Sequence, residues 1–116
     1  MTPPTKVLYF DQTPGDPFRP GWQRRLLHTD HLMTVVLDID NGPWSAPDPF
    51  HSHPHEQITY VAAGEVLFLS ENEEPKRLRA GDVVAVASGR PHAIQLLSHR
   101  ARLVDNFNPI REDFLK

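Results

Sequence analysis

Short runs of β-branched and apolar residues, separated by turn residues roughly every ten positions, constrain the fold of this chain most strongly. Residues 32–39 form one such run, which ends at the turn cluster of residues 40–43. Residues 83–87 form another, which we expect to be a buried strand between the turns at Gly81 and Gly89. No segment keeps the period of an amphipathic helix. The pattern is typical of an all-β sandwich or small barrel.

Further β-prone runs follow the same layout. Residues 57–63 and 65–70 flank Gly64, and we expect them to pair as a hairpin. Residues 92–98 and 101–107 complete the series of expected strands. A chain of 116 residues provides one domain with a modest core, so we expect no second domain.

Residues 1–21 differ from the rest of the chain because they hold five of its twelve prolines. They predict an extended arm with at most one edge strand, at residues 7–10, and residues 22–116 then form the barrel domain. Open sheet edges and a proline-rich arm favour a homodimer that exchanges N-terminal segments. A loose tail is the alternative interpretation of the same composition.

Composition excludes several classes of function. The net charge is −3 and no run of basic residues occurs, so nucleic acid is not an expected partner. The chain has no cysteine, which excludes disulfides and thiolate chemistry. No apolar stretch approaches the length of a membrane span, and the first ten residues lack the layout of a signal peptide. We therefore expect a cytoplasmic protein whose partner is a small molecule.

Four of the seven histidines gather in two short segments that contain proline, residues 51–57 (HSHPHEQ) and 89–92 (GRPH). Residues two apart on a strand point to the same side, so His51 and His53 can share one ion. Surface histidines in a loop are the alternative, but the second segment makes a metal site the better interpretation. The remaining histidines, His28, His31 and His99, are expected to face solvent.

Gln57 keeps the strand parity of His53, and His92 arrives from a distant strand, so both are candidate ligands. A shell of imidazole and oxygen ligands suits one divalent ion of Ni, Fe, Mn, Co, Cu or Zn. Glu56 is the rival oxygen ligand, although its parity turns it to the opposite side of the strand unless a bulge intervenes. His55 shares the inward parity, either as a residue that lines the pocket or as a further ligand.

The last expected strand carries a carboxylate toward the interior. Alternation places Leu103, Asp105 and Phe107 on one face and Arg102 on the other, so the Leu103 face turns inward. Burying an unpaired charge is costly, so Asp105 either meets a cation or is kept for chemistry. Arg111 is the candidate cation, either for Asp105 or for a substrate carboxylate.

The motif around the histidines resembles the signature of the cupin family over roughly residues 30–107. The matching pattern is His-x-His, three residues, an acceptor, six residues and Gly64, followed by Gly81-Asp82 and Gly89-x-Pro91-His92. Two positions depart from the pattern: Gln57 stands where the family usually has glutamate, and Ala87 where it usually has proline. The resemblance implies a single jelly-roll barrel, also called a double-stranded β-helix.

Residues 51–61 (HSHPHEQITYV) and the ending 105–115 (DNFNPIREDFL) are similar to one group of small bacterial cupins. Members of that group open the ring of 4,5-unsaturated uronates during pectin and alginate degradation. The resemblance implies metal ligands at His51, His53, Gln57 and His92. It implies active-site roles for Asp105 and Arg111, with Phe107 lining the pocket. We expect Phe107, Arg111 and, because of its inward parity, His55 to contact the substrate. The alternatives are another metal-dependent cupin enzyme, such as a dioxygenase, or a cupin that only binds a sugar.

The implied chemistry agrees with the residue types. Proton transfer to C4 and addition of water at C5 convert the enol ether of the substrate into a hemiketal, which collapses to an open-chain ketone. Asp105 would move the proton, Arg111 would stabilise the negative charge, and Phe107 would supply an apolar wall. Ordinary packing is expected for Tyr60, Trp22 and Trp44.

Overall fold

The computed structural model describes all residues, Met1–Lys116. It contains nine strands and two short 3-10 helices, η1 (Phe10–Gln12) and η2 (Glu112–Leu115). In chain order the strands are β1 (Asp16–Arg19), β2 (Trp22–His28), β3 (Met33–Ile39), β4 (Glu56–Ala63), β5 (Glu65–Ser70), β6 (Lys76–Arg79), β7 (Val83–Val86), β8 (His92–Leu96) and β9 (Ala101–Asn108). The predicted all-β class is confirmed. None of the helices is long and apolar enough to cross a membrane.

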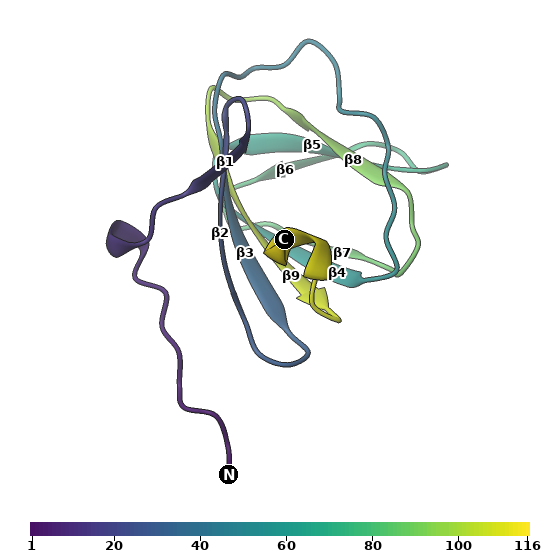
Figure 1. The fold of residues 1–116 in the computed structure, drawn as a ribbon. Helices are drawn as coiled ribbons and strands as arrows, with labels where there is room; N and C mark the ends of the chain where they lie inside the picture. The colour runs from purple at the N-terminus through teal and green to yellow at the C-terminus, as the bar shows by residue number, and fades with distance from the viewer.

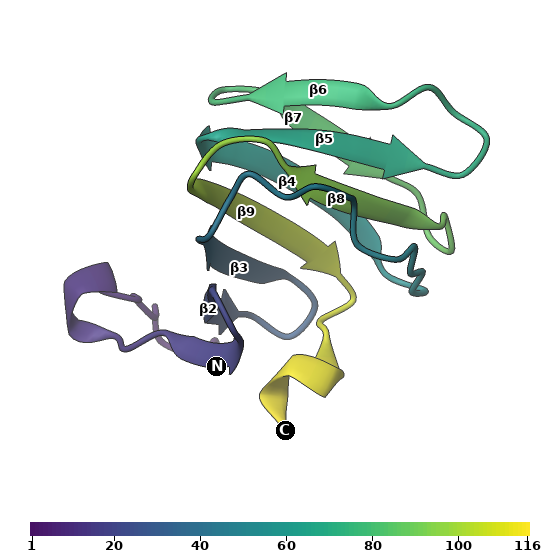
Figure 2. The ribbon, with the colours of Figure 1, turned by 90° about the horizontal axis from the view of Figure 1, so that it is seen from above.

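The strands form two antiparallel sheets that face each other as layers of a jelly roll (Figures 1 and 2). The six-stranded sheet has the order β1-β2-β3-β9-β4-β7, and the three-stranded sheet has the order β6-β5-β8. Period-two alternation explains the core, because every second residue of β3 and β9 is buried. Val35 and Leu103 come from the larger sheet, whereas Val66 and Leu96 come from the smaller one.

The predicted hairpin across Gly64 is wrong. β4 pairs with β7 and β9, whereas β5 pairs with β6 and β8, so the chain changes sheets at Gly64. Gly64 has a φ of +82°, and a Cβ atom there would lie 2.7 Å from the Cα atom of Ala101. Only glycine allows this turn and this close approach together. Both runs form strands, as predicted, but the alternation of side chains along a strand does not specify which sheet the strand joins.

Three other local predictions also need correction. Residues 83–87 were expected to be buried, but β7 is an edge strand on which Val83 is 59% exposed. The only strand within the first 21 residues lies at Asp16–Arg19 instead of residues 7–10. Tyr60 was expected in the core, but its side chain is 42% exposed on the outer face of β4. The two tryptophans pack as expected, because Trp22 and Trp44 lie against the core with ring centroids 5.8 Å apart.

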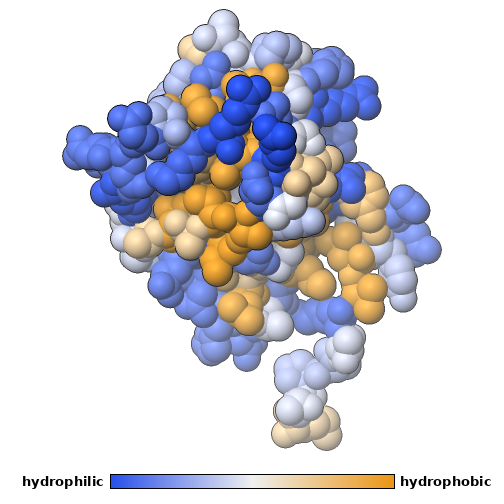
Figure 3. Space-filling model, turned by 180° about the vertical axis from the view of Figure 1, so that it is seen from behind, coloured by the Kyte–Doolittle hydropathy of each residue, from blue (hydrophilic) through white to orange (hydrophobic).

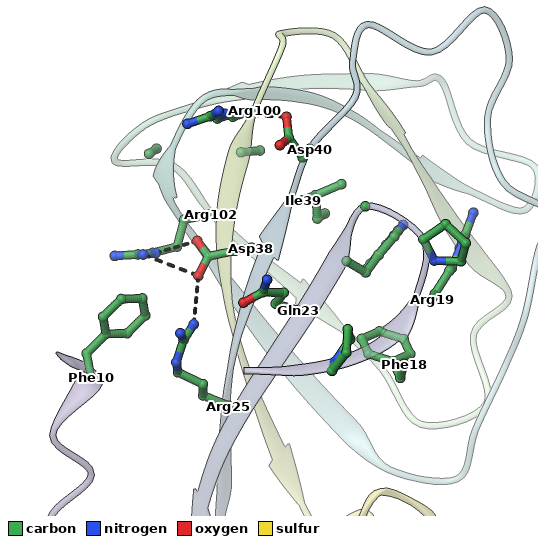
Figure 4. A pocket seen from close by; sticks show the side chains of 16 residues that line it. Phe10, Phe18, Arg19, Gln23, Arg25, Asp38, Ile39, Asp40, Arg100 and Arg102 are labelled. Carbon is green, nitrogen blue, oxygen red and sulfur yellow. Dashed lines mark hydrogen bonds and ion pairs between the residues drawn. The ribbon is translucent and has the colours of Figure 1, made fainter. Parts of the chain in front are cut away.

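The arm preceding β1 runs away from the two sheets (Figure 1) and is held near its middle by one aromatic ring. The guanidinium groups of Arg25 and Arg102 lie 3.9 and 4.4 Å from the ring centroid of Phe10. Both arginines also pair with Asp38, as Figure 4 shows. These residues border a hollow of about 800 Å³ on the outside of the barrel. Four arginines and two aspartates line this hollow, so its charged side chains are predominantly basic.

Hydrophobic side chains also reach the surface. On the side opposite the view of Figure 1, they gather near the middle of the face and again on the side of the N-terminal arm, with polar residues around them (Figure 3). On the outer face of the larger sheet, Ile58 is 51% exposed, and Tyr60 lies directly opposite Val83 in the register of β4 and β7. The interior of the barrel remains separate from this surface, because inward and outward side chains alternate along each strand.

Candidate metal and substrate site

Main-chain pairing places the first and last candidate histidines side by side. The N–H of His51 donates to the carbonyl of His92 at 3.0 Å, and the N–H of His92 donates to the carbonyl of His51 at 2.9 Å. The two rings consequently lie with centroids 4.3 Å apart. His92 is the first residue of β8, so the smaller sheet fixes one member of the pair.

His53 completes the group from the segment before β4. Its carbonyl accepts a hydrogen bond of 2.8 Å from the N–H of Gly89, which ties the two histidine segments together. The ring centroid of His53 lies 5.0 Å from that of His92. One ring nitrogen from each of His51, His53 and His92 falls within 4.8 Å of the others. The structure therefore brings together the three predicted histidine ligands.

Hydrogen bonds select the ring nitrogen that each buried histidine presents. His92 Nδ1 lies 2.7 Å from the carbonyl of Arg90, and His53 Nδ1 lies 3.1 Å from the carbonyl of His55. A carbonyl only accepts, so each Nδ1 carries the proton and each Nε2 keeps a free lone pair. His92 Nε2 is buried without any hydrogen-bond partner. A buried lone pair without a donor suits a metal ion.

The histidines are also held in the neutral form that binds metals. Partial desolvation of the His51 ring, together with the neighbouring His92 and His53, lowers the pKa of His51 to about 4. Burial is likewise the main cause of the lowered pKa of His53 and of His92. Neutral imidazole is the ligand form, so no proton needs to be displaced near neutral pH.

Gln57 is the oxygen-bearing neighbour of this group. Its Oε1 atom lies 3.0 Å from His53 Nε2, and its side chain is buried at the start of β4. Two lone pairs that face each other at this distance fit a cation held by both. Glu56 is exposed and points to the other side of the strand, as its parity predicted. The residues present therefore fit a site of three nitrogens and one oxygen.

A chain of hydrogen bonds connects Gln57 to Asp105 through Thr59. Gln57 Nε2 donates to Thr59 Oγ1 at 2.8 Å, and Thr59 Oγ1 donates to Asp105 Oδ1 at 2.6 Å. Thr59 lies directly opposite Asp105 in the register of β4 and β9, which brings the two side chains together. All three side chains are buried. Thr59 was not singled out from the sequence, although it shares the inward parity of Gln57.

Asp105 turns into the barrel, as the alternation of the last strand predicted. Burial raises the pKa of Asp105 to about 6, whereas the Thr59 hydroxyl and the charge of Arg111 act in the opposite direction. Val35 lies opposite Asp105 on the other neighbouring strand. A carboxyl group with this pKa can both accept and release a proton near neutral pH.

Arg111 lies after β9 and is fixed by the short helix that follows. Its Nε and Nη2 atoms donate to the two carboxylate oxygens of Asp113 at 3.1 and 2.8 Å. The guanidinium lies 4.2 Å from the ring centroid of Phe114 and 5.1 Å from that of Phe107. The side chain of Arg111 is only 14% exposed, whereas that of Asp113 is 55% exposed. Arg111 therefore pairs with Asp113, and Asp105 takes its hydrogen bond from Thr59.

A pocket of about 330 Å³ joins these groups. Its lining includes His51, His92, Gln57, Asp105, Phe107 and Arg111. Phe114, which the sequence did not single out, adds an aromatic wall. This pocket is smaller than the outer hollow beside the arm, but its polar groups converge on one space.

His55 lies beside the site, with its ring centroid 5.4 Å from that of His53 and 6.2 Å from that of Phe107. Its Nδ1 atom is buried and has no hydrogen-bond partner. It is not one of the three histidines whose nitrogens converge. Outside the motif, His28 Nδ1 lies 2.8 Å from the carbonyl of Thr29, and His99 Nδ1 lies 3.3 Å from the carbonyl of Gly42. His31 is exposed.

Residues 35–105 match the family model described as a cupin domain. This stretch includes both histidine segments and reaches Asp105. The chain belongs to the cupin family. The predicted jelly-roll fold and the resemblance seen in the two motifs are confirmed by this match.

Two full-length relatives are similar to this cupin. It is 34% identical over 107 residues to the pectin degradation protein KdgF of Dickeya dadantii, covering 90% of this chain and 94% of that protein. The solved structure of KdgF from Halomonas sp. matches with a TM-score of 0.84 and 31% identity, covering 94% of this chain and 99% of that chain. Both matches extend over nearly the whole of each protein.

A third relative is similar over a shorter stretch. The cupin is 53% identical over 65 residues to the dimethylsulfoniopropionate lyase DddQ of Ruegeria pomeroyi, covering 56% of this chain and 31% of that protein. The solved structure of DddQ matches with a TM-score of 0.71 and 29% identity, covering 91% of this chain and 56% of that chain. The sequence similarity to DddQ is thus confined to about half of this chain, and the structural match covers only about half of the DddQ chain.

Proposed function

We propose that this cupin is a metal-dependent enzyme that opens the ring of 4,5-unsaturated uronates. The observation that carries the proposal is the meeting, in one pocket, of a buried carboxyl group at Asp105, a cation at Arg111 and two members of the histidine group, His51 and His92, whose nitrogens converge with that of His53. The similarity to KdgF, a pectin degradation protein, over nearly the whole chain supports a substrate that arises in pectin degradation.

The candidate ligands of one divalent transition metal are His51, His53, His92 and Gln57. When bound, the ion would supply Lewis-acid stabilisation of negative charge on the substrate. Gln57 is neutral, so it leaves more positive charge at the site than a glutamate would. This favours an anionic ligand such as a uronate.

The reaction balances with one water and no redox partner. A proton adds to C4 of the alkene while a water molecule adds its oxygen to C5 and loses a proton, which gives a hemiketal. Cleavage of the bond between C5 and the ring oxygen then leaves a ketone at C5, and the ring oxygen takes up the hydroxyl proton. Asp105 is placed to exchange these protons because its pKa of about 6 is near the working range.

Arg111 is the group we assign to the substrate carboxylate. Its planar guanidinium can donate two parallel hydrogen bonds, and the bidentate contact with Asp113 holds its direction. Phe107 and Phe114 form the apolar walls beside it. A flat, partly unsaturated sugar ring with one negative charge matches this combination.

A lyase acting on dimethylsulfoniopropionate is a second candidate, favoured by the 53% identity to DddQ over 65 residues. Its substrate carries a positive sulfonium group, which aromatic rings bind well when their faces are free. Here the guanidinium of Arg24 lies 4.3 Å from the centroid of Phe114, and that of Arg19 lies 4.7 Å from the centroid of Trp22. The aromatic faces already carry cations, which disfavours a cationic substrate.

The test is to mix the metal-loaded protein with 4,5-unsaturated galacturonate or mannuronate and follow the loss of ultraviolet absorbance from the conjugated alkene. Proton NMR of the product should show the open-chain ketone. The variant Asp105→Asn serves as the matched control. A parallel sample with dimethylsulfoniopropionate is assayed for release of dimethyl sulfide.

Rapid alkene loss with the parent and slow loss with Asp105→Asn is the expected result. Sulfide release without alkene loss would replace the uronate proposal with the lyase. Activity on neither substrate would refute both assignments and direct the search to oxygen-consuming cupin chemistry.

A further inference from the structure

Thr59 stands between two groups of the site and touches both through one hydroxyl. Its Oγ1 atom lies 2.6 Å from Asp105 Oδ1 on one side and 2.8 Å from Gln57 Nε2 on the other. The side chain of Thr59 is 2% exposed, so no solvent competes for these contacts. A hydroxyl has a single proton to donate, and this limits how the chain of hydrogen bonds can run.

The direction of the chain follows from the donors and acceptors. Ionised Asp105 only accepts, so the Thr59 proton points to Asp105, and the Thr59 oxygen is left to accept from the Gln57 amide group. Gln57 must then turn its nitrogen toward Thr59 and its oxygen toward His53. The reversed amide would make Gln57 and Asp105 compete for one proton, and Asp105 would lose its only side-chain hydrogen bond to the protein.

We propose that Thr59 is a positioning residue whose single hydroxyl proton sets the direction of the Gln57 amide and thereby presents the amide oxygen to the metal position. The same contact holds the carboxylate of Asp105. Thr59 is therefore assigned a role in metal binding without being a ligand. This inference rests on the metal site of the proposed function, but not on the identity of the substrate.

The structure also explains why a neutral ligand needs such a partner. The two oxygens of a carboxylate are equivalent, so a glutamate would present an oxygen in either orientation. An amide presents either an oxygen or two N–H donors, and only the oxygen can bind a cation. Gln57 therefore requires a hydrogen-bond partner that accepts from its amide N–H group and so leaves its oxygen facing the metal position.

The first test compares Co²⁺ affinity, by competition with a chromophoric chelator, in the parent, Thr59→Val and Thr59→Ser. Loss of the hydroxyl should weaken binding by about tenfold or more, whereas serine should stay within about threefold of the parent. The visible spectrum of bound Co²⁺ should change in Thr59→Val and be restored in Thr59→Ser. The matched control is Thr34→Val, because the Thr34 hydroxyl donates to Asn106 at 2.7 Å on the exposed face of the same sheet.

A double-mutant cycle with Gln57→Glu separates orientation from general packing. In the Gln57→Glu background, Thr59→Val should change Co²⁺ affinity by less than about threefold, because the direction of a carboxylate does not matter. An equally large effect in both backgrounds would mean that Thr59 acts through packing. Parent-like affinity and spectrum in Thr59→Val would overturn the assignment.

A measurement on the unsubstituted protein remains decisive if Thr59→Val does not fold. In NMR of metal-free protein, the Gln57 side-chain N–H protons should show nuclear Overhauser contacts to Thr59. Contacts to the His53 ring instead would reverse the amide and refute the proposal. If the parent binds no Co²⁺, the metal site itself is refuted. If the parent binds Co²⁺ and Thr59→Val binds it equally well, only the role of Thr59 is refuted.

Discussion

His51 and His92 exchange two main-chain hydrogen bonds, of 3.0 and 2.9 Å, although they lie in segments far apart in the sequence. The pair is thus an isolated bridge that brings the loop before β4 against the start of β8. Because only main-chain atoms make the bridge, either side chain can be replaced without removing it. The metal group and the fold can therefore be tested separately.

Replacement of His51 by alanine should remove metal binding and leave the protein folded. His51 is exposed, so truncation creates no buried cavity, yet one of three converging nitrogens is lost. We expect the affinity for Co²⁺ or Zn²⁺ to fall by about 100-fold or more. Chelator competition measures the affinity, and circular dichroism reports the fold.

His31→Ala is the matched control for this change, since His31 is an exposed histidine outside the group. It should bind metal as the parent does. Equal loss of affinity in both variants, or none in His51→Ala, would contradict the assignment of His51.

Asp105→Asn should stabilise the metal-free protein at neutral pH. Burial raises the pKa of Asp105 from 3.8 to about 6, so the folded state favours the protonated form. Stability is therefore lost as the pH rises between these values, to a total of about 3 kcal/mol at most. The asparagine variant avoids this loss. Its advantage in urea denaturation should be greatest above pH 6 and shrink toward pH 4.

The histidines act in the opposite direction and do not obscure the comparison. Their folded-state pKa values are lowered, to about 4 for His51, so they stabilise the fold above their unfolded pKa of 6.5. That stability is lost as the pH falls toward the folded values. Parent and variant share it. An advantage of Asp105→Asn that does not change with pH would show that Asp105 is not protonated in this range.

Arg111→Lys should raise KM for the uronate more than it lowers kcat. Lysine keeps the charge but cannot make the paired contact of a guanidinium, so we expect roughly a tenfold rise in KM or more. Asp113→Asn should raise KM by a smaller factor, because it weakens only the bidentate contact that holds Arg111. Steady-state kinetics distinguish the two parameters. The control Arg77→Lys, at an exposed residue of β6, should match the parent.

Gly64→Ala should destabilise the fold more than Gly81→Ala. Both glycines have a positive φ, but the added Cβ at Gly64 would meet Ala101, whereas at Gly81 it would meet nothing within 4 Å. We expect a loss of about 1 kcal/mol at Gly81 from backbone strain alone, and clearly more at Gly64. Urea denaturation measures both. Equal losses would mean that the change of sheets at Gly64 does not require close approach.

The homodimer expected from the sequence stays a prediction. Val7 and Tyr9 on the arm are 60% and 61% exposed, and Val83 adds apolar surface on the edge strand β7. Light scattering during size exclusion should give twice the chain mass of 13.2 kDa. Deletion of residues 1–9 should weaken the association if arms are exchanged. A single-chain mass at all concentrations would contradict the prediction.

Parity along single strands made the interior of the site predictable. Alternation placed Gln57 and Asp105 inside and Glu56 outside, because neighbouring side chains of a strand point to opposite faces. The histidine spacing identified the group whose nitrogens converge. These features depend only on residues close together in the sequence or on a known motif.

Relationships between strands were not predictable in the same way. The partner of Thr59 is Asp105 on a different strand, and the hydrogen bond depends on a register that no local pattern reveals. β2 escaped prediction because Arg24 and Arg25 interrupt its apolar residues. Both lie against neighbouring side chains, and their pairing with Asp16 and Asp38 becomes visible only in three dimensions.

Arg111, Asp113 and Phe114 all lie within the last six residues, outside both sheets. Phe114 packs against the core, so the C-terminal segment lies close to the strands, whereas the N-terminus lies far from them in Figure 1. An affinity tag at the C-terminus would therefore lie next to the pocket. Proteolytic removal of these residues would leave a folded, metal-binding protein that lacks Arg111 and binds the substrate carboxylate weakly. A tag is better placed at the N-terminus. If activity is lost on storage, mass spectrometry of the intact protein should be used first, to detect loss of the last few residues.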